Sequence, residues 1–481
     1  MRLYFSWVLF FYGVLIAPVL LISWCFSEPF FLSLLWRSLM LGLGLFIVLL
    51  MLGLIAHRSH RFSSGYHYFL LVMFWFGASL LSACFFMLYP LDLSWVDAFF
   101  AGVSGLTTTG TEVFKDLTLL PKSLLFYRMW LQFLGGLGII LMAVTAFSSG
   151  GFEVLRGVKF DLPGPVVSYS EKKPKMSDMA QYLWLIYAGS TLLCVLSMKS
   201  LGLDWFESVC ESFSVLSTGG YGLYNEGVAH YQSQGVKVLM MLFMLFSSVN
   251  FLLHYQFFIL REAGGYLRNY EFRGYLMQLS MVTVIVFFTF YYVRDVGAGV
   301  DGFFMVVSLL SSSGFAVTDI QAWPSFLPHL MIWIGLIGGC AGSTSGGVKM
   351  IRLQFCCQEV FRACRLMIHP RVVLSDPAVS VGMSGSSVDS QIVIMRGFIM
   401  AFLAYFILSI FVLTGLGLTF QNAFFSICAC LSNTGLILTL PQGAVGLSDA
   451  VKLWLSLTML FGRIEILAFL VMFSPQYWME G

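Results

Sequence analysis

The chain has 481 residues, of which 59% are hydrophobic and only 10% are charged, whereas soluble domains carry roughly 25% charged residues. With a mean hydropathy of +0.87, this composition excludes an ordinary soluble protein and indicates a polytopic membrane protein. The formal net charge of +2 is too small to favour a nucleic-acid partner. The ten cysteines and seven histidines form neither a CxxC pair nor a zinc-type cluster, so we predict no bound cofactor.

Apolar runs of about 20 residues, long enough to span a bilayer, recur along the whole chain. The first run is too long for a signal-peptide core and lacks a small-x-small cleavage site, so we interpret it as a retained transmembrane helix. The candidate spans are 3–26, 36–56, 66–90, 124–149, 179–200, 236–260, 275–293, 326–354, 391–416 and 450–473.

The span at 326–354 is interrupted by the sequence GGCAGSTSGGVK, residues 338–349. Glycines and small polar side chains can hardly sustain a regular helix, so this span is predicted to be broken. Polar stretches at 153–178, 261–274 and 355–390 connect other spans, and none is long enough to indicate a separate globular domain.

A short motif, a glycine after small and mostly hydroxyl-bearing residues, occurs four times between the spans. Its glycines are Gly110, Gly220, Gly314 and Gly435, and a helix-starting type of residue stands thirteen positions before each: Asp97, Glu207, Asp301 and Asn422. Asp and Asn are favoured N-caps, and Asp204 would assist Glu207. Each motif therefore predicts a half-helix of about ten residues, some 15 Å long, that ends in a hydroxyl-rich loop.

Two full spans lie between successive loops, so all four loops must enter from the same membrane face. We interpret the chain as an all-α membrane protein of four tandem repeats, each with a span, a half-helix, a loop and a second span, around one pseudo-fourfold pore. The predicted divisions are an N-terminal hairpin at 1–60 and repeats at 61–150, 151–262, 263–375 and 376–481. A loop at membrane depth must be buried in protein or line a water-filled cavity, and four loops around one axis meet this condition.

Charge distribution predicts which face the loops enter. The loop-bearing segments 90–122, 199–237, 293–319 and 415–452 carry twelve acidic and six basic residues, and the opposite segments 57–65, 153–178, 261–274 and 349–396 carry sixteen basic and nine acidic residues. By the positive-inside rule the loops open to the outside. Asp92, Glu112, Asp116 and Glu226 would attract cations there, or are simply solvated loop charges.

The chemistry of the four loops fits ion conduction. A ring of backbone carbonyls can replace the hydration shell of an alkali cation, and glycine permits the positive φ that aims such carbonyls inward. Small hydroxyl residues can also serve only to let membrane helices pack closely. Four copies with one thirteen-residue offset favour the conducting interpretation.

Three further stretches resemble the Trk/Ktr/HKT superfamily of potassium transporters, most closely the TrkH-type membrane subunit of bacterial Trk systems. They are FYRMWLQFLGGLGII at 126–140, GGCAGSTSGGVKMIR at 338–352 and MLFGRIEILAFLVMF at 459–473. The resemblance covers essentially the whole chain. It implies a non-enzymatic, multi-pass protein of the bacterial inner membrane that takes up potassium through a single filter built from the four loops.

The resemblance places the K⁺ filter at sixteen residues: Thr107, Thr108, Thr109, Gly110, Ser217, Thr218, Gly219, Gly220, Ser311, Ser312, Ser313, Gly314, Ser432, Asn433, Thr434 and Gly435. Family members with serine in place of the first filter glycine tend toward Na⁺, and this chain keeps Gly110, which favours K⁺.

The interruption at 338–349 resembles the family's intramembrane gate, although a kinked helix that allows close packing would also explain it. The gate residues so implied are Gly338, Gly339, Gly342, Ser343, Thr344, Gly346, Gly347, Lys349 and Arg463. An arginine such as Arg463 near the middle of a span costs roughly 2.5–3.5 kcal/mol, so it should have a partner. Either it pairs structurally with an acid or a carbonyl of another repeat, or its charge shapes the permeation path. Glu465, two residues away, should point elsewhere.

Two rival functions remain open from the residues alone. GVSG at 102–105 and GMSG at 382–385 match the GxSG pattern of an intramembrane serine protease, but the first lies in a half-helix and the second in a polar connector. A secondary cation transporter coupled to Na⁺ or H⁺ is also compatible, although its repeats would usually be inverted.

Partners follow only from the resemblance. It implies a homodimer and a cytosolic ring of nucleotide-binding, TrkA-type regulatory subunits that docks on the basic segments 153–178, 261–274 and 355–375. These segments are equally explained as orientation signals near anionic membrane lipid. The transported substrate would be the potassium ion.

Overall fold

The computed structural model describes residues 2–56, 67–148, 176–262, 264–293, 299–318, 320–324, 326–369, 388–436 and 444–475. Every regular element in these ranges is a helix. The predicted segments 57–65 and most of 153–178 and 370–387 lie outside the described residues. The described part is therefore all-helical, as the composition predicts.

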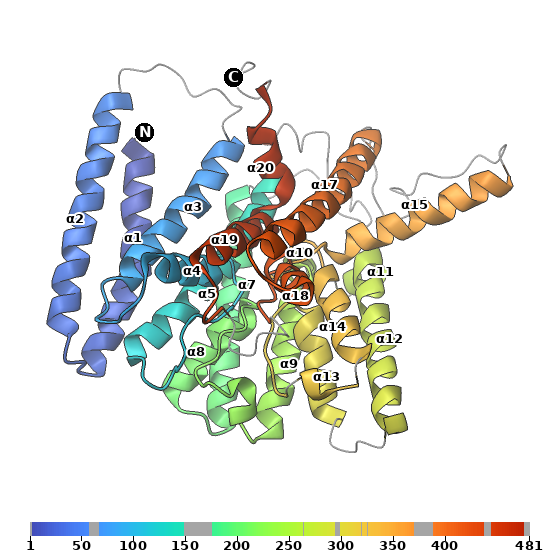
Figure 1. Cartoon of the computed structure of the whole chain (residues 1–481), viewed down its shortest axis with the longest axis horizontal. Coiled ribbons are helices and arrows are strands. Elements are labelled where there is room, and N and C mark those ends of the chain that lie inside the picture. Colours follow the sequence, from blue (N-terminus) through green and yellow to red (C-terminus); the bar gives the residue numbers. More distant parts are fainter. Residues whose placement is uncertain are drawn as a thin grey trace.

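The helices follow one order four times along the chain (Figure 1). After the hairpin of α1 (Arg2–Cys25) and α2 (Phe31–Ala56) come α3 (His67–Phe86), α4 (Trp95–Leu106) and α5 (Lys122–Ser148). The next group is α7 (Met176–Ser200), α8 (Trp205–Leu216), α9 (Gln234–Ser248) and α10 (Phe251–Phe258), with the short helices η2 (Gly227–His230) and α11 (Gly265–Arg268) beside it.

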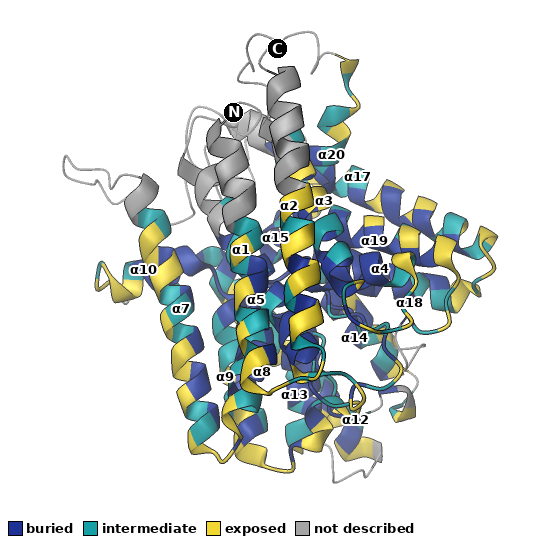
Figure 2. Ribbon diagram, turned by 90° about the vertical axis from the view of Figure 1, so that its left-hand side faces the viewer, coloured by how far each residue is buried: buried dark blue, intermediate teal, exposed yellow. Residues whose placement is uncertain are grey.

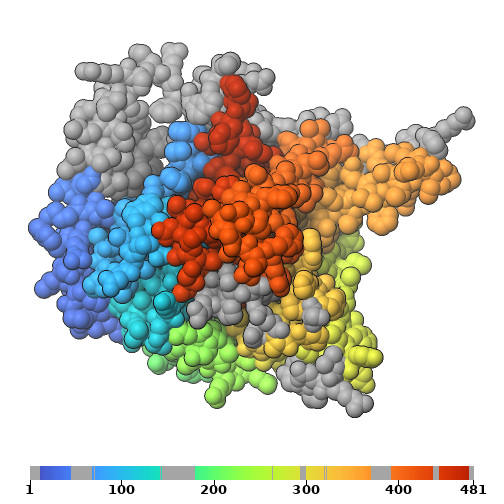
Figure 3. Space-filling view, in the orientation of Figure 1, coloured from blue at the N-terminus to red at the C-terminus, as the bar shows by residue number. Residues whose placement is uncertain are grey.

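The second half of the chain continues this order. It contains α12 (Tyr270–Val293), α13 (Gly299–Leu310), η4 (Ile320–Ala322), α14 (Phe326–Ile337) and α15 (Met350–Ile368), then α17 (Val388–Gly415), α18 (Phe420–Leu431), α19 (Asp449–Ile464) and α20 (Ile466–Met472). The space-filling view shows α15 projecting from the body of the molecule (Figure 3).

Four described helices are long and apolar enough to cross a membrane: Lys122–Ile140, Met179–Ser200, Tyr270–Tyr292 and Ile392–Gly415. Exposed residues lie on the outer helices and buried residues in the interior (Figure 2). Many of the exposed side chains are large and apolar, as expected of a protein surrounded by lipid. The break at 338–349 between α14 and α15 is confirmed.

The prediction of continuous spans at 236–260 and 450–473 is wrong, because each of them is a bent pair of helices. The chain bends by 97° between α9 and α10 and by 102° between α19 and α20. The second bend lies at Glu465, whose φ is +71°. Arg463 therefore lies at the end of α19, rather than in the middle of a straight helix. Apolar composition alone did not show these breaks because neither contains a run of glycines.

The four short helices, α4, α8, α13 and α18, each have 12 residues, close to the predicted length. The predicted N-caps are displaced by one turn. Ser94 and Thr419 cap α4 and α18, and their hydroxyls accept the N–H groups of Asp97 (3.0 Å) and Asn422 (3.3 Å). Asp204 caps α8, where the Glu207 carboxylate accepts its N–H at 3.1 Å. The thirteen-residue offset thus marks the third helical position, which favours a carboxylate near the positive helix end.

Candidate functional site

Four hydroxyl-rich loops, 107–110, 217–220, 311–314 and 432–435, begin where the four 12-residue helices end. In each loop the third residue donates its backbone N–H to the carbonyl five residues earlier. The donor–acceptor distances are 2.9 Å for Thr109, 2.8 Å for Gly219 and Ser313, and 3.0 Å for Thr434. The four loops therefore share one backbone fold, although only the final glycine is common to their sequences.

The backbone has positive φ at two positions of every loop. The final glycines have φ of 79°, 79°, 73° and 65° for Gly110, Gly220, Gly314 and Gly435. These values confirm the prediction that glycine stands at these positions because the backbone there has positive φ. The second residues, Thr108, Thr218, Ser312 and Asn433, also have positive φ, between 52° and 58°. Non-glycine residues adopt this conformation only at a cost, so the surrounding packing must hold it.

The glycines place the loops in a closed ring. A Cβ added to Gly110 would lie 2.0 Å from the Gly219 carbonyl oxygen of the next loop. The same relation joins Gly220 to the Ser313 oxygen (2.1 Å), Gly314 to the Thr434 oxygen (1.7 Å), and Gly435 back to the Thr109 oxygen (1.9 Å). No side chain fits at any of the four positions. Each glycine therefore permits the third carbonyl of the neighbouring loop to approach, and four such contacts surround one axis.

The helices around the loops close the same ring. Helix α5 packs against α8, α9 against α13, α14 against α18, and α19 against α4. Two of these four junctions carry an ion pair. Lys237 contacts Asp301 at 2.8 Å, and Lys452 contacts Asp97 at 2.5 Å. Because α19 is near the end of the chain and α4 near its start, the last pair joins segments far apart in sequence.

The side chains of three loops also share one arrangement. The hydroxyls of the first and third residues pair within hydrogen-bonding distance: Thr107 with Thr109 (2.8 Å), Ser311 with Ser313 (2.8 Å) and Ser432 with Thr434 (3.0 Å). These hydroxyls are buried and paired with one another, so they are not free groups. They stabilise each loop and leave the backbone carbonyls as the polar groups available at the axis.

The glycine-rich loop, residues 338–349, lies against the helix side of the hydroxyl-rich loops. The Ser345 hydroxyl donates to the Ser311 carbonyl at 2.7 Å, and the Thr218 hydroxyl donates to that of Thr344 at 3.2 Å. A Cβ on Gly346 would lie 2.2 Å from the Ser432 carbonyl oxygen. The loop therefore touches three of the four hydroxyl-rich loops, at their first and second residues.

The break between α9 and α10 holds the glycine-rich loop through the backbone. Cys340 N–H donates to the Ser248 carbonyl at 2.9 Å, and Phe251 N–H donates to the Gly342 carbonyl at 3.0 Å. A Cβ on Gly342 would lie 2.9 Å from the Asn250 side-chain oxygen, so glycine is needed there. The bend at 249–250 exposes backbone groups that a continuous helix would have satisfied internally, and the loop uses them.

Arg463 joins the glycine-rich loop to α5. Its guanidinium donates to the Thr344 carbonyl at 2.8 Å and to the Gly135 carbonyl at 3.3 Å, and the residue is 3% exposed. Within the described ranges, its hydrogen-bond partners are therefore carbonyls of other segments, and no acid pairs with it. Glu465 points elsewhere, as expected, and accepts from Arg352 at 2.6 Å.

Glu271, which the sequence did not single out, holds both ends of the break. One carboxylate oxygen accepts the N–H of Ala341 at 2.7 Å and that of Ile351 at 3.2 Å. Lys349 has a φ of +74° and donates through its ammonium to the Ser345 carbonyl at 2.6 Å. Glu271 lies in the first turn of α12, but in the sequence it falls within the polar stretch 261–274, where a carboxylate is unremarkable by composition, so no sequence signal pointed to it.

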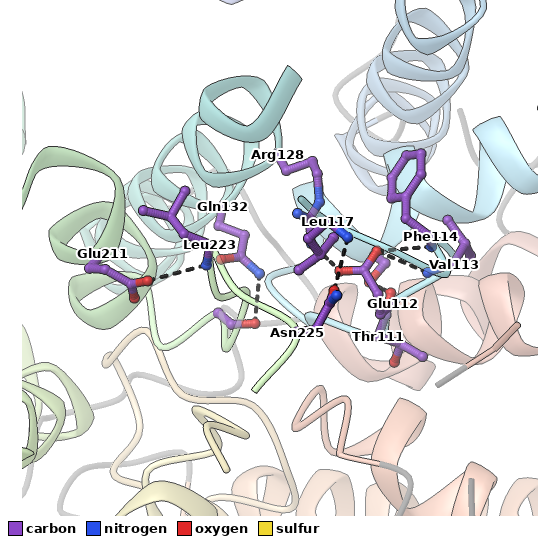
Figure 4. A network of polar contacts seen from close by, with 12 residues as sticks. Thr111, Glu112, Val113, Phe114, Leu117, Arg128, Gln132, Glu211, Leu223 and Asn225 are labelled. Atoms are coloured by element: carbon purple, nitrogen blue, oxygen red, sulfur yellow. Dashed lines mark hydrogen bonds and ion pairs between the residues drawn. The ribbon is translucent and has the colours of Figure 1, made fainter. Parts of the chain in front are cut away.

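The acids predicted to attract cations near the hydroxyl-rich loops have unequal roles, and Figure 4 shows Glu112 among its partners. Glu112 pairs with the fully buried Arg128 and accepts the N–H groups of Val113 and Phe114 at 3.0 and 3.1 Å. It therefore anchors the segment after Gly110 and is not a free charge that could attract cations near the loops. Asp116 lies at the surface, and hydrogen bonds from Thr118 and Asn225 hold the pKa of its carboxyl below the usual value.

The structure does not support a serine-protease site at GVSG, residues 102–105. Ser104 of the GVSG sequence is buried in α4, and its hydroxyl donates to the Thr111 carbonyl at 3.0 Å. It therefore supports the chain after the loop. The second copy, GMSG at 382–385, lies outside the described residues.

Comparisons with known proteins agree with this geometry. A family model described as "TrkH: Cation transport protein" matches residues 42–480. The "Trk system potassium uptake protein TrkH" of Vibrio parahaemolyticus is 32% identical over 97% of this chain and 98% of its own length. The TrkH protein of Escherichia coli K12 is 33% identical over 81% of this chain and 80% of its own length.

A solved structure extends the likeness to three dimensions. The crystal structure of the potassium transporter TrkH from Vibrio parahaemolyticus superposes with a TM-score of 0.82 at 28% identity, and covers 99% of this chain and 98% of that one. The earlier resemblance is thereby confirmed. The chain is a multi-pass membrane protein and belongs to the TrkH cation transport protein family.

Proposed function

We propose that this protein is the membrane subunit of a Trk-type system that takes up potassium across the bacterial inner membrane. The observation that carries the proposal is the ring of four glycine–carbonyl contacts, made by Gly110, Gly220, Gly314 and Gly435. Relatives over most of the chain are named as Trk system potassium uptake proteins. The pore runs through this ring, and the chain is organised as four tandem repeats around it, with the boundaries given above.

The sixteen residues of the four hydroxyl-rich loops form the selectivity filter. Carbonyl oxygens can replace the hydration shell of K⁺ without fixed carboxylates at the narrowest point. The four short helices direct the negative ends of their dipoles at the same place, which favours a cation. The buried hydroxyl pairs support the loops from behind.

The glycine-rich loop acts as the gate. It lies against the filter on the side where the short helices end, and Gly338, Gly342 and Gly347 have positive φ of 76°, 72° and 83°. Ser345 and Thr344 link it to the filter, and Arg463 links it to α5. A loop tied by a few polar contacts can move as a unit while the filter keeps its shape.

A cytosolic TrkA-type regulatory ring and a second copy of this chain are the proposed partners. The projecting helix α15 begins directly after the gate at Lys349, and its Phe361 and Met367 are exposed by 69% and 84%. A partner that holds α15 would therefore act on the gate through continuous backbone. Anionic lipid would contact the basic segments on the same side.

The test is ion flux into liposomes that contain the purified protein. We expect uptake of K⁺ and Rb⁺ in preference to Na⁺, driven by an imposed membrane potential. Uptake that requires a Na⁺ or proton gradient would favour the secondary transporter, and equal uptake of Na⁺ and K⁺ would contradict the filter assignment.

A further inference from the structure

The second of the four hydroxyl-rich loops differs from the others at its third position. Loops one, three and four have Thr109, Ser313 and Thr434 there, and each hydroxyl pairs with that of the first residue. Loop two has Gly219, which has no side chain to pair with Ser217. The Ser217 hydroxyl keeps only its bond to the short helix, in which it donates to the Ser214 carbonyl at 3.1 Å, and the first-residue hydroxyls of the other loops also bond to their own short helices. One quarter of the ring thus lacks the side-chain support that the other three share.

The side chain of Gln132, on helix α5, occupies the vacant place (Figure 4). A Cβ on Gly219 would lie 2.3 Å from the Gln132 amide carbon, so no other residue fits there while Gln132 is present. The Gln132 amide nitrogen donates to the Gly219 carbonyl at 2.6 Å, and the residue is fully buried. Only the nitrogen can face this carbonyl, because two oxygens would repel each other.

The bonded carbonyl is one of the four that form the ring. The Gly219 oxygen is the atom that stands against Gly110, at 2.0 Å from its notional Cβ. Among the four third-position carbonyls, this is the one for which the described residues supply a side-chain donor. The ring is therefore asymmetric at the level of its carbonyls, although its backbone is fourfold.

The junction between α14 and the fourth loop shows the opposite arrangement, with the small residue on the helix and the larger one in the loop. Gln132 lies three residues before Gly135, and Gly335 lies three residues before Gly338. Gly135 and Gly338 both face the second residue of their own loop, Thr108 and Ser312, at 3.2 Å from a notional Cβ. Gly335 therefore corresponds to Gln132.

The residues that face these two positions are also exchanged. A Cβ on Gly335 would lie 3.5 Å from the Thr434 methyl group, whereas Gln132 faces Gly219. At these two junctions, the helix has glycine where the loop has Thr434, and the helix has glutamine where the loop has Gly219. The side chain that fills the space between helix and loop thus comes from the loop at one junction and from the helix at the other, as close packing requires.

We propose that Gln132 is a positioning residue for the filter, which sets the direction of the Gly219 carbonyl and thereby contributes to the preference for K⁺ over Na⁺. This inference rests on the proposed function. The hydrogen bond from the Gln132 side-chain amide fixes the Gly219 carbonyl, which no side chain of its own loop supports. Without the donor the carbonyl is free to turn toward the smaller Na⁺ or away from the axis, because selectivity depends on the number and placement of the coordinating oxygens.

The test is a double-mutant cycle in liposomes, with the ratio of Rb⁺ to Na⁺ uptake as the readout and thermal unfolding as the measure of folding. Gln132→Ala leaves a hole, and Gly219→Ser clashes with the glutamine. We expect each single change to lower the ratio about tenfold, equivalent to ~1.4 kcal/mol. The double variant removes the clash and supplies a hydroxyl to pair with Ser217, as in the other loops. Its ratio should return to within about threefold of the parent, a strong positive coupling.

A volume-matched variant separates hydrogen bonding from packing. Gln132→Met fills the same space and cannot donate, so it should unfold near the parent temperature yet show the lowered ratio. An unchanged ratio for Gln132→Met, or additive losses in the double variant, would overturn the proposal. If the parent protein itself does not prefer Rb⁺ to Na⁺, the proposed function fails instead, and the two failures are thus distinguished.

Discussion

The four hydroxyl-rich loops and the glycine-rich loop both depend on glycines with positive φ, but they are held in opposite ways. Each hydroxyl-rich loop is fixed by bonds to its own short helix and by one contact to the next loop, repeated around the ring. The glycine-rich loop has no such repetition. It is held by unlike partners from several segments: Ser248, Phe251, Glu271 and Arg463. Local, repeated support suits a rigid element, whereas distributed support by single contacts suits an element that moves.

The largest effect should follow from a change in the rigid ring. Gly110→Ser places a Cβ 2.0 Å from the Gly219 carbonyl oxygen, at a φ of +79°. We expect the Rb⁺ to Na⁺ uptake ratio to fall by at least about tenfold, equivalent to ~1.4 kcal/mol. Gly202→Ser is the matched control, because Gly202 has a φ of +100° and open space around it. A fall of the same size in both variants would assign the effect to backbone strain and not to contact with the ring carbonyl, and an unchanged ratio for Gly110→Ser would contradict the filter assignment.

The sequence predicted the repeated hydroxyl-rich loops better than it predicted the glycine-rich loop. The four loops repeat, so a thirteen-residue offset revealed them, and the positive φ of Gly110 and its counterparts was expected. The positive φ of Thr108 was not, because threonine does not normally adopt it. The contacts of the glycine-rich loop could not be predicted, since each occurs once and joins segments far apart in sequence. The partners of Arg463 are two backbone carbonyls, which any sequence supplies, so no residue type marked them.

The next effect tests the bond between the glycine-rich loop and Arg463. Replacing Arg463 with Gln removes a buried charge and weakens the hold on the Thr344 carbonyl, so basal flux should rise while the Rb⁺ to Na⁺ ratio stays constant. A unit charge about 8 Å from the ion contributes roughly 2 kcal/mol at an effective dielectric of 20, more than tenfold in rate. The measurement is flux per folded molecule for the Gln, Ala and Lys variants.

Two outcomes for Arg463 distinguish charge from structure. Arg463→Lys should keep much of the barrier, because the charge remains. If Arg463→Gln is slower than the parent or unfolds at a markedly lower temperature, the arginine is a structural anchor for the carbonyls and not a barrier to the ion.

A smaller effect is expected at Glu271, which acts only on the loop's ends. Glu271→Leu removes the acceptor for the Ala341 and Ile351 N–H groups, and leaving buried donors unsatisfied costs about 1–3 kcal/mol. Part of this cost should appear as a several-fold rise in basal flux, since the closed loop loses its clamp. Glu271→Gln is the control, because its amide oxygen can still accept both bonds and flux should stay near the parent value. A rise of the same size in the Gln variant would assign the effect to the lost charge.

The smallest effect should come from the protein surface at Asp116, where neither kind of loop is touched. Hydrogen bonds from Thr118 and Asn225 favour the ionised form of Asp116 and hold its pKa below the usual value. Their contribution to stability is therefore complete above the ordinary pKa of an aspartate and is lost as the pH falls through the lowered one. At neutral pH Asp116 is a fixed negative charge, but solvent and salt screen it. Asp116→Asn keeps an acceptor oxygen for Thr118 and removes only the charge. Rb⁺ uptake should therefore fall less than about twofold at low ionic strength and should not fall at high salt. A larger loss that persists at high salt would show that the Asp116–Asn225 contact supports the ring itself, and the outer loops would then belong with the rigid region.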